Sequence, residues 1–168
     1  MRLLGELGLS FDLCMRPGEL ADGVRLARLC PGTRFIVDHC GNADPKAFLA
    51  ESDATTDKRS THDPNRWRHD METFARLNNV VCKISGVVAG VTRSDIRAEQ
   101  LAPIVNLCLD AFGPDRVVFG GDWPVCLLGA TLREWIDTLA EIVAERRSSD
   151  QRKLWHDNAV LFYSLDKG

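Results

Sequence analysis

Four short apolar runs of the kind that form β-strands recur along the chain, and each precedes a segment with helical periodicity. The runs lie at Leu9–Met15, Arg34–His39, Val80–Ser85 and Arg116–Gly120. The nearly continuous apolar character of the second and fourth runs is typical of strands that are covered on both faces. Strands that alternate with helices predict βαβ units, and hence an α/β fold with a parallel sheet and right-handed crossovers.

Helices are expected in the segments that follow these runs. Gly113-Pro114 should end the third helix, and Thr131 with Glu134 three positions later forms a capping box at the start of the fourth. The polar segment Glu51–Asn65 is expected to be a long loop. The predicted helices are Gly18–Leu29, Asn65–Leu77, Ala98–Phe112, Thr131–Arg147 and Asp150–Tyr163.

Composition limits the classes of function. The 168 residues, of which 27% are charged, fit one globular domain over residues 1–168. A formal net charge of -3 gives no electrostatic basis for binding nucleic acid. No uncharged apolar stretch is long enough for a membrane span or a signal peptide, so we predict a soluble cytoplasmic protein.

Six cysteines are dispersed through apolar segments without a CxxC pair. This distribution is typical of buried, reduced thiols rather than of a disulfide framework. A zinc site built from cysteines would need closely spaced ligand pairs, so we expect none here. The sequence also lacks a GxGxxG or P-loop motif and the GxSxG elbow of serine hydrolases.

Three of the four apolar runs deliver residues capable of chemistry, each beside a glycine that lets the backbone turn sharply. In parallel α/β folds, active residues collect at the carboxyl ends of the strands. The residues in question are Asp38 and His39 after the second run, Lys83 and Ser85 in the third, and Asp122 and Trp123 after the fourth.

Each of these residues has a functional and a structural interpretation. His39 and Asp122 can form an acid/base pair, with Asp122 as base or metal ligand, but Asp122 can also turn the chain and His39 can be a hydrogen-bonded core histidine. Lys83 can hold a carboxylate or a developing oxyanion, or it can extend its ammonium to solvent. Trp123 can line a pocket for a ring-shaped substrate or serve only in packing.

Four motifs follow one another along nearly the whole chain: FIVDHCGNADP (35–45), NVVCKISG (79–86), RVVFGGDWPV (116–125) and HDNAVLFYSL (156–165). In this order they resemble the amidohydrolase-related family, specifically the sugar-lactonase branch that contains fuconolactonase-like and pyrone-dicarboxylate-lactonase-like proteins. That family is built as a (β/α)8 TIM barrel. The resemblance implies a partial barrel here, with four βα units that correspond to strands five to eight, plus a C-terminal helix.

The resemblance also implies roles for individual residues. Asp122 matches the strand-eight aspartate, which activates the hydrolytic water and ligates the ion in metal-bearing members. His39 matches the strand-six histidine, which polarises the carbonyl or protonates the leaving oxygen. Lys83 and Ser85 stand where the strand-seven motif lines the substrate pocket, with Trp123 as a further substrate-binding residue.

The implied activity is hydrolysis of a sugar lactone or a carboxylated lactone by a water that Asp122 activates. A divalent metal such as zinc is the cofactor that such a site can take, with Asp122 as a ligand. The strand-one HxH pair of the family has no counterpart in this chain. The strand at Leu9–Met15 also carries no histidine.

Four strands do not close an eight-stranded barrel, so the outer strands should expose unpaired backbone and apolar inner faces. Three hypotheses follow: a missing N-terminal half lies upstream, two copies form a homodimer, or the half-barrel is degenerate and acts as a binding or structural dimer without catalysis. A nucleotide-binding regulator has little support because the glycine-rich motifs are absent.

Overall fold

A four-stranded parallel sheet with the order β1-β2-β3-β4 lies at the centre of the computed structural model, which describes residues 1–48, 62–91 and 96–165. This arrangement confirms the predicted α/β fold. Each strand falls within the apolar run that predicted it. The strands are β1 (Ser10–Leu13), β2 (Arg34–Val37), β3 (Val80–Ile84) and β4 (Val117–Phe119).

Helices connect the strands and cover the sheet. The longer ones are α2 (Leu20–Leu29), α4 (Pro64–Ala75), α5 (Ala98–Phe112) and α6 (Leu132–Ile142). The shorter ones are α1 (Arg2–Glu6), α3 (His39–Asn42), α7 (Ser148–Arg152), the π-helical turn η5 (Lys153–Asp157), α8 (Asn158–Tyr163), and the 3-10 turns η1 (Pro17–Glu19), η2 (Pro45–Phe48), η3 (Val87–Gly90) and η4 (Val125–Leu128).

The predicted helix boundaries are reproduced to different degrees. The third helix, α5, has the predicted limits, and Thr131 caps α6 through the expected capping box with Glu134. However, α6 ends at Ile142 rather than at Arg147. Most of the predicted loop Glu51–Asn65 lies outside the described residues.

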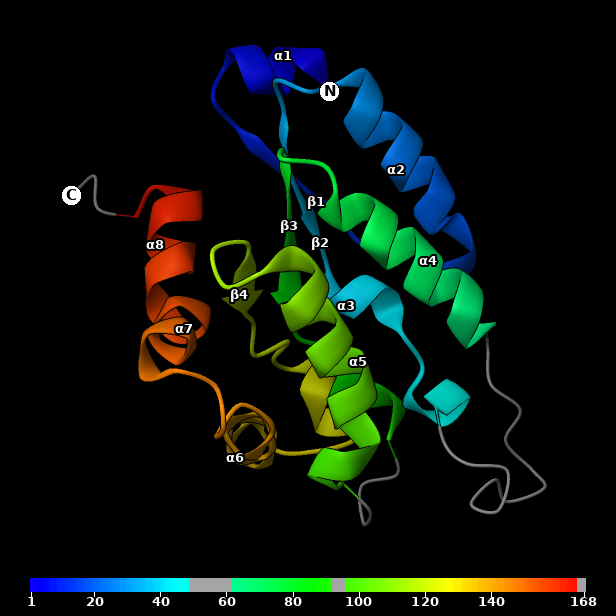
Figure 1. Cartoon of the computed structure of the whole chain (residues 1–168), viewed down its shortest axis with the longest axis vertical. Helices are drawn as coiled ribbons and strands as arrows, with labels where there is room; N and C mark the ends of the chain where they lie inside the picture. Colours follow the sequence, from blue (N-terminus) through cyan, green and yellow to red (C-terminus); the bar gives the residue numbers. More distant parts are fainter. Residues whose placement is uncertain (49–61, 92–95, 166–168) are drawn as a thin grey trace.

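One face of the sheet packs against α4 and α5, and α2 lies beside α4 on the same side (Figure 1). Alternate strand residues point to this side because successive side chains of a strand face opposite ways. They join the core residues of the three helices in a single apolar cluster. The strand residues of this cluster are Leu13, Phe35, Val37, Val80, Cys82, Ile84 and Val117.

The opposite face of the sheet is also covered, which corrects the expectation of an exposed apolar inner face. Ile36, Val81 and Val118 are almost fully buried there. In Figure 1 helix α8 lies on the side of the sheet away from α2 and α4. Arg34 of β2 donates from Nη1 to the Phe162 carbonyl of α8 at 2.9 Å. The C-terminal helix therefore occupies this side of the sheet.

The two outer strands differ in how their edges are covered. At β4, the side-chain amide of Asn158 donates to the Val117 carbonyl at 2.7 Å. At β1, Phe11 is 37% exposed and the preceding Leu9 is 51% exposed. The edge at β1 thus presents apolar side chains to solvent, as expected for an outer strand.

Within the described ranges, no helix combines the length and apolar character that a membrane crossing requires.

Candidate functional site

His39 and Asp122 lie together at the carboxyl edge of the sheet, as the sequence predicted. His39 follows β2 and Asp122 follows β4, and His39 Nε2 is 3.8 Å from Asp122 Oδ1. Both side chains are largely buried, with 21% and 13% exposed. The 3.8 Å separation is too long for a hydrogen bond, so the two groups face each other without bonding directly.

The backbone at both residues is strained. His39 has a φ of 55° and Asp122 a φ of 51°, in the left-handed region that residues other than glycine rarely adopt. Such a conformation costs about 1–3 kcal/mol and persists only where the surrounding structure enforces it. The fold therefore holds both side chains at this edge against a local preference, which is typical of functional sites.

Ser85 and Gly86 fix the imidazole of His39. Ser85 is fully buried, and its Oγ lies 2.9 Å from His39 Nδ1. Gly86 has a φ of 73°, and a Cβ at this position would lie 2.6 Å from the Cβ of His39. The backbone of Gly86 thus packs directly on His39, and the Ser85 hydroxyl is engaged by the histidine.

Lys83 is held between two carboxylates. Its Nζ lies 2.7 Å from Asp12 Oδ2 of β1 and 2.7 Å from Asp38 Oδ1 at the end of β2. Burial alone would lower the pKa of Lys83, but the two carboxylates outweigh it and raise that pKa above its ordinary value. Lys83 is therefore a permanently charged group with anionic partners, rather than a cation extended to solvent.

Tyr163 approaches this cluster from the C-terminal helix. Its phenol interacts with Lys83, and burial raises the pKa of Tyr163 above its ordinary value. Trp123 differs from the other predicted residues, because its indole is 69% exposed. The indole is therefore not buried by the described residues, and its role in substrate binding stays a prediction.

Three potential metal ligands, one of them His39, lie close together at the carboxyl edge of the sheet. The Sγ of Cys14, a carboxylate oxygen of Asp38 and a ring nitrogen of His39 all lie within 4.8 Å of one another. Apart from the ion pair with Lys83, the buried Asp38 Oδ1 accepts no hydrogen bond from the described residues. Sulfur, nitrogen and carboxylate oxygen are the donors that zinc prefers, so this set fits a zinc ion.

Sequence reasoning missed Asp12, Cys14 and Tyr163 as members of the site and did not assign a role to Asp38. Asp12 and Cys14 could have been found from the sequence, since they are two positions apart near the carboxyl end of the first apolar run and so face the same side of the strand. Tyr163 carried none, because its place depends on how the last helix crosses the sheet.

Comparison with known proteins places the chain in a family. The model of the amidohydrolase family matches residues 1–165. An L-fucono-1,5-lactonase of Burkholderia multivorans is 39% identical over 139 residues, which are 78% of this chain and 43% of the lactonase.

Solved structures agree with this match. An amidohydrolase from Burkholderia multivorans with bound HEPES superposes with a TM-score of 0.83 at 29% identity, over 97% of this chain and 55% of that protein. A crystal form of an amidohydrolase from the same organism with bound zinc gives a TM-score of 0.81 at 28% identity, with the same coverage. The chain spans about half the length of the proteins it matches. This chain, with its four-stranded parallel sheet and its strand-end histidine and aspartate, belongs to the amidohydrolase family.

Proposed function

We propose that the protein is part of a hydrolase that opens a sugar lactone. The observation that carries the proposal is the pair of His39 and Asp122, held 3.8 Å apart in strained backbone at the carboxyl edge of the sheet. It is supported by the 39% identity to a protein named L-fucono-1,5-lactonase. The four strands then correspond to strands five to eight of a (β/α)8 barrel.

In this mechanism, Asp122 takes the proton of a water that attacks the lactone carbonyl. A tetrahedral intermediate forms, and its collapse breaks the bond between the carbonyl carbon and the ring oxygen. His39 Nε2 hydrogen-bonds the reacting oxygen or protonates the leaving ring oxygen, so that a hydroxy acid is released. The Ser85 hydroxyl lies at the opposite ring nitrogen and so fixes the orientation of the imidazole.

Substrate binding is assigned to groups around this pair. The exposed indole of Trp123, next to Asp122, offers a flat apolar surface to a sugar ring. Lys83, paired with Asp12 and Asp38, acts mainly by fixing those carboxylates on the site side of the sheet. It can contact an anionic substrate group only by sharing its ammonium with them.

A divalent metal fits the same place. In this alternative arrangement Cys14, Asp38 and His39 would hold a zinc ion, with Asp122 as the adjacent carboxylate, and His39 would then be a ligand rather than the proton donor. When bound, such an ion supplies a Lewis acid for the carbonyl and lowers the pKa of its water. Under this arrangement, Cys14 takes the place of a ligand in the strand where no histidine occurs.

We further propose that the complete site forms when other strands pair with the edge of β1. The apolar Leu9 and Phe11 at this edge are 51% and 37% exposed, which suits continuation of the sheet. A longer form of the chain or a second copy can supply the strands. Light scattering on the purified protein distinguishes the two, because only the second copy makes a dimer of this chain.

The decisive experiment compares hydrolysis of L-fucono-1,5-lactone by the wild type and by Asp122→Asn, with and without added Zn²⁺. We expect turnover in the wild type and a loss of at least about 100-fold in kcat for the variant, the usual effect of losing a general base. The circular dichroism spectrum should stay unchanged, since Asn keeps the shape of the side chain.

Asp137→Asn is the matched control. Asp137 is an exposed residue of α6 in an ion pair with Arg133 and lies in none of the contacts described above. This variant should keep wild-type activity. Equal turnover in the wild type and in Asp122→Asn would refute the role of Asp122, and a folded wild type without lactone turnover under either condition would refute lactone hydrolysis by this chain alone.

A further inference from the structure

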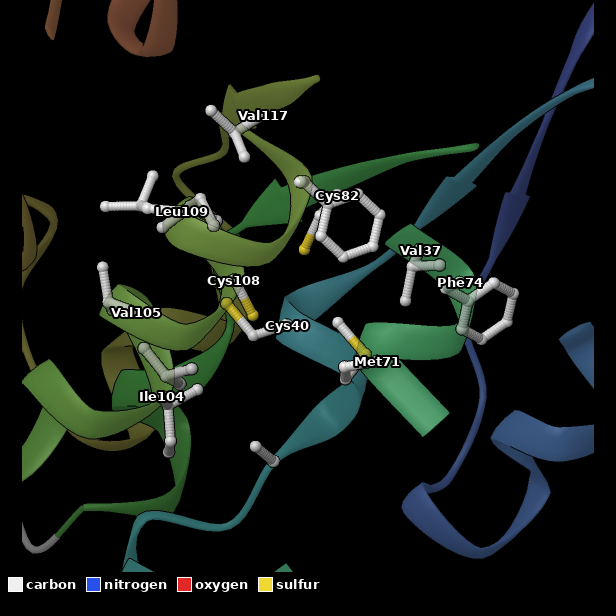
Figure 2. Packing of buried hydrophobic residues seen from close by; sticks show 14 of the residues in the cluster. Val37, Cys40, Met71, Phe74, Cys82, Ile104, Val105, Cys108, Leu109 and Val117 are labelled. Carbon is white, nitrogen blue, oxygen red and sulfur yellow. The ribbon is translucent and has the colours of Figure 1, made fainter. Parts of the chain in front are cut away.

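Three cysteines meet in the core, on the side of the sheet that faces the helices. Cys40 follows β2, Cys82 lies in β3 and Cys108 lies in α5, and their Sγ atoms are all within 4.8 Å of one another. All three side chains are fully buried. Figure 2 shows the sulfur atoms gathered among apolar side chains such as Val105 and Leu109. The proposed hydrolase mechanism uses none of them.

The spacing of these sulfur atoms suits a single bound ion. An ion in the plane of three sulfurs, at about 2.3 Å from each as is usual for metal–thiolate bonds, requires sulfur separations of about 4.0 Å, and a pyramidal centre such as As(III) requires somewhat shorter ones. The observed separations of up to 4.8 Å require each sulfur to move by less than about 1 Å to reach this geometry. The spacing of the residues in the sequence does not reveal this cluster, since they come from three separate elements.

The three thiols interact with one another, and the Sγ atoms of Cys40 and Cys82 also lie 3.8 and 4.0 Å from the Lys83 carbonyl oxygen. Cys108 and Cys82 donate toward the sulfur of Cys40, which lowers the pKa of Cys40 below that of an ordinary thiol. Burial raises the pKa of Cys82 above its ordinary value. The thiolate is the form of cysteine that binds metals, so the three thiols lose their protons when an ion binds.

We propose that Cys40, Cys82 and Cys108 form a three-coordinate thiolate site for a soft, thiophilic ion. The donor set is all sulfur, which selects soft ions over magnesium, calcium or manganese. Structural zinc sites are almost always four-coordinate, and the described residues bring only these three ligands together in the core cluster. Three-coordinate As(III) and Cu(I) both satisfy this chemistry.

The charge of the surroundings favours the trivalent ion. Arsenous acid, As(OH)₃, condenses with three thiols to form three As–S bonds while three As–O bonds break. Each thiol proton leaves with a hydroxide as water, and no atom changes its oxidation state. The product is neutral, whereas Cu(I) held by three thiolates would leave two negative charges among apolar side chains, which is costly.

The site lies directly behind the candidate hydrolase site. Cys40 is the neighbour of His39 in the chain, and both residues have left-handed backbone, with φ of 50° and 55°. Cys82 precedes Lys83 in β3, and the two side chains point to opposite faces of the sheet. An ion that draws the three sulfurs together therefore pulls on the backbone of His39 and Lys83.

The test is anaerobic titration of the reduced wild-type protein with arsenite, with Cu(I) and with Zn²⁺, each in a separate experiment. We expect one equivalent of arsenite or Cu(I) to bind, with a thiolate charge-transfer absorption band and three sulfur neighbours in the X-ray absorption spectrum. The titration in which binding is observed identifies the ion. The same wild-type spectrum decides the coordination number even where a variant does not fold.

Cys108→Ala removes one ligand and should weaken arsenite binding by at least about 100-fold, because the third intramolecular bond is lost. Cys126→Ala is the matched control, since Cys126 is equally buried but lies outside the trio, and it should keep one equivalent. A folded wild type that binds neither arsenite nor Cu(I), a spectrum with fewer than three sulfur neighbours, or binding of Zn²⁺ alone with additional nitrogen or oxygen donors would overturn the proposal.

Discussion

Removal of the Lys83 ammonium tests how the ion pairs on the site side of the sheet contribute to stability. Lys83→Met keeps the apolar stem but leaves Asp12 and Asp38 without their shared cation. Both carboxylates lie 2.7 Å from Nζ, so distance alone predicts equal contributions. Burial predicts unequal ones, because the side chain of Asp38 is 11% exposed and that of Asp12 is 40% exposed.

The magnitude follows from these exposures. Removing one partner of a buried ion pair costs about 3–5 kcal/mol, because an uncompensated charge stays buried. An exposed pair contributes only about 0–1 kcal/mol. The Asp38 pair lies near the first case and the Asp12 pair near the second. We therefore expect Lys83→Met to lower the free energy of unfolding by about 3 kcal/mol, near the lower limit for a buried pair.

Double-mutant cycles measured by urea unfolding separate the two pairs. The cycles combine Lys83→Met with Asp12→Asn and with Asp38→Asn, and constant m-values check that the unfolded states are comparable. The coupling energy should be about 2 kcal/mol for Asp38 and below about 1 kcal/mol for Asp12. Equal coupling energies, or a larger one for Asp12, would refute the argument from burial.

Three further predictions concern stability. The pKa of Lys83 is raised in the folded state, so its contribution to the free energy of unfolding is complete below the unfolded-state pKa of about 10.4. This contribution is lost as the pH rises toward the folded-state pKa. Wild-type urea midpoints should therefore fall more steeply than those of Lys83→Met between about pH 10 and 12. Gly86→Ala should cost about 1–3 kcal/mol in thermal unfolding, because the left-handed backbone and the contact with His39 both oppose a Cβ. Thr131→Ala should cost about 1 kcal/mol in urea unfolding, because the capping box with Glu134 is lost.

The regular part of the fold could be predicted because its signals are local. Apolar runs located the four strands, helical periodicity located the helices between them, and the capping box located the start of α6 at Thr131. The end of α6 at Ile142 was not predictable in this way, since the helical pattern continues and no glycine follows to stop it. Covering of the second sheet face by α8 was also missed, because the path of a terminal helix is set by distant contacts such as that of Arg34 with Phe162.

The candidate site shows the same division. His39 and Asp122 could be predicted to meet because both follow strands of one parallel sheet. The ion pair of Lys83 with Asp12 could not be predicted, because Asp12 lies 71 positions earlier, on a strand that is separated from β3 by β2. The long lysine side chain reaches across the intervening strand, and no sequence period encodes that reach.

The cysteines show most clearly where spacing misleads. The expectation of buried, reduced thiols holds for Cys30, Cys40, Cys82, Cys108 and Cys126, whereas Cys14 is exposed. The expectation that the spacing supplies no cysteine zinc site stays a prediction, but wide spacing does not keep the cysteines apart, because a parallel sheet aligns residues from different βα units. Pairing of β2 with β3 brings Val37 opposite Cys82, and α5 packs Cys108 onto them. In such folds, ligand pairs should be sought at equivalent depths of neighbouring strands rather than at short intervals along the chain.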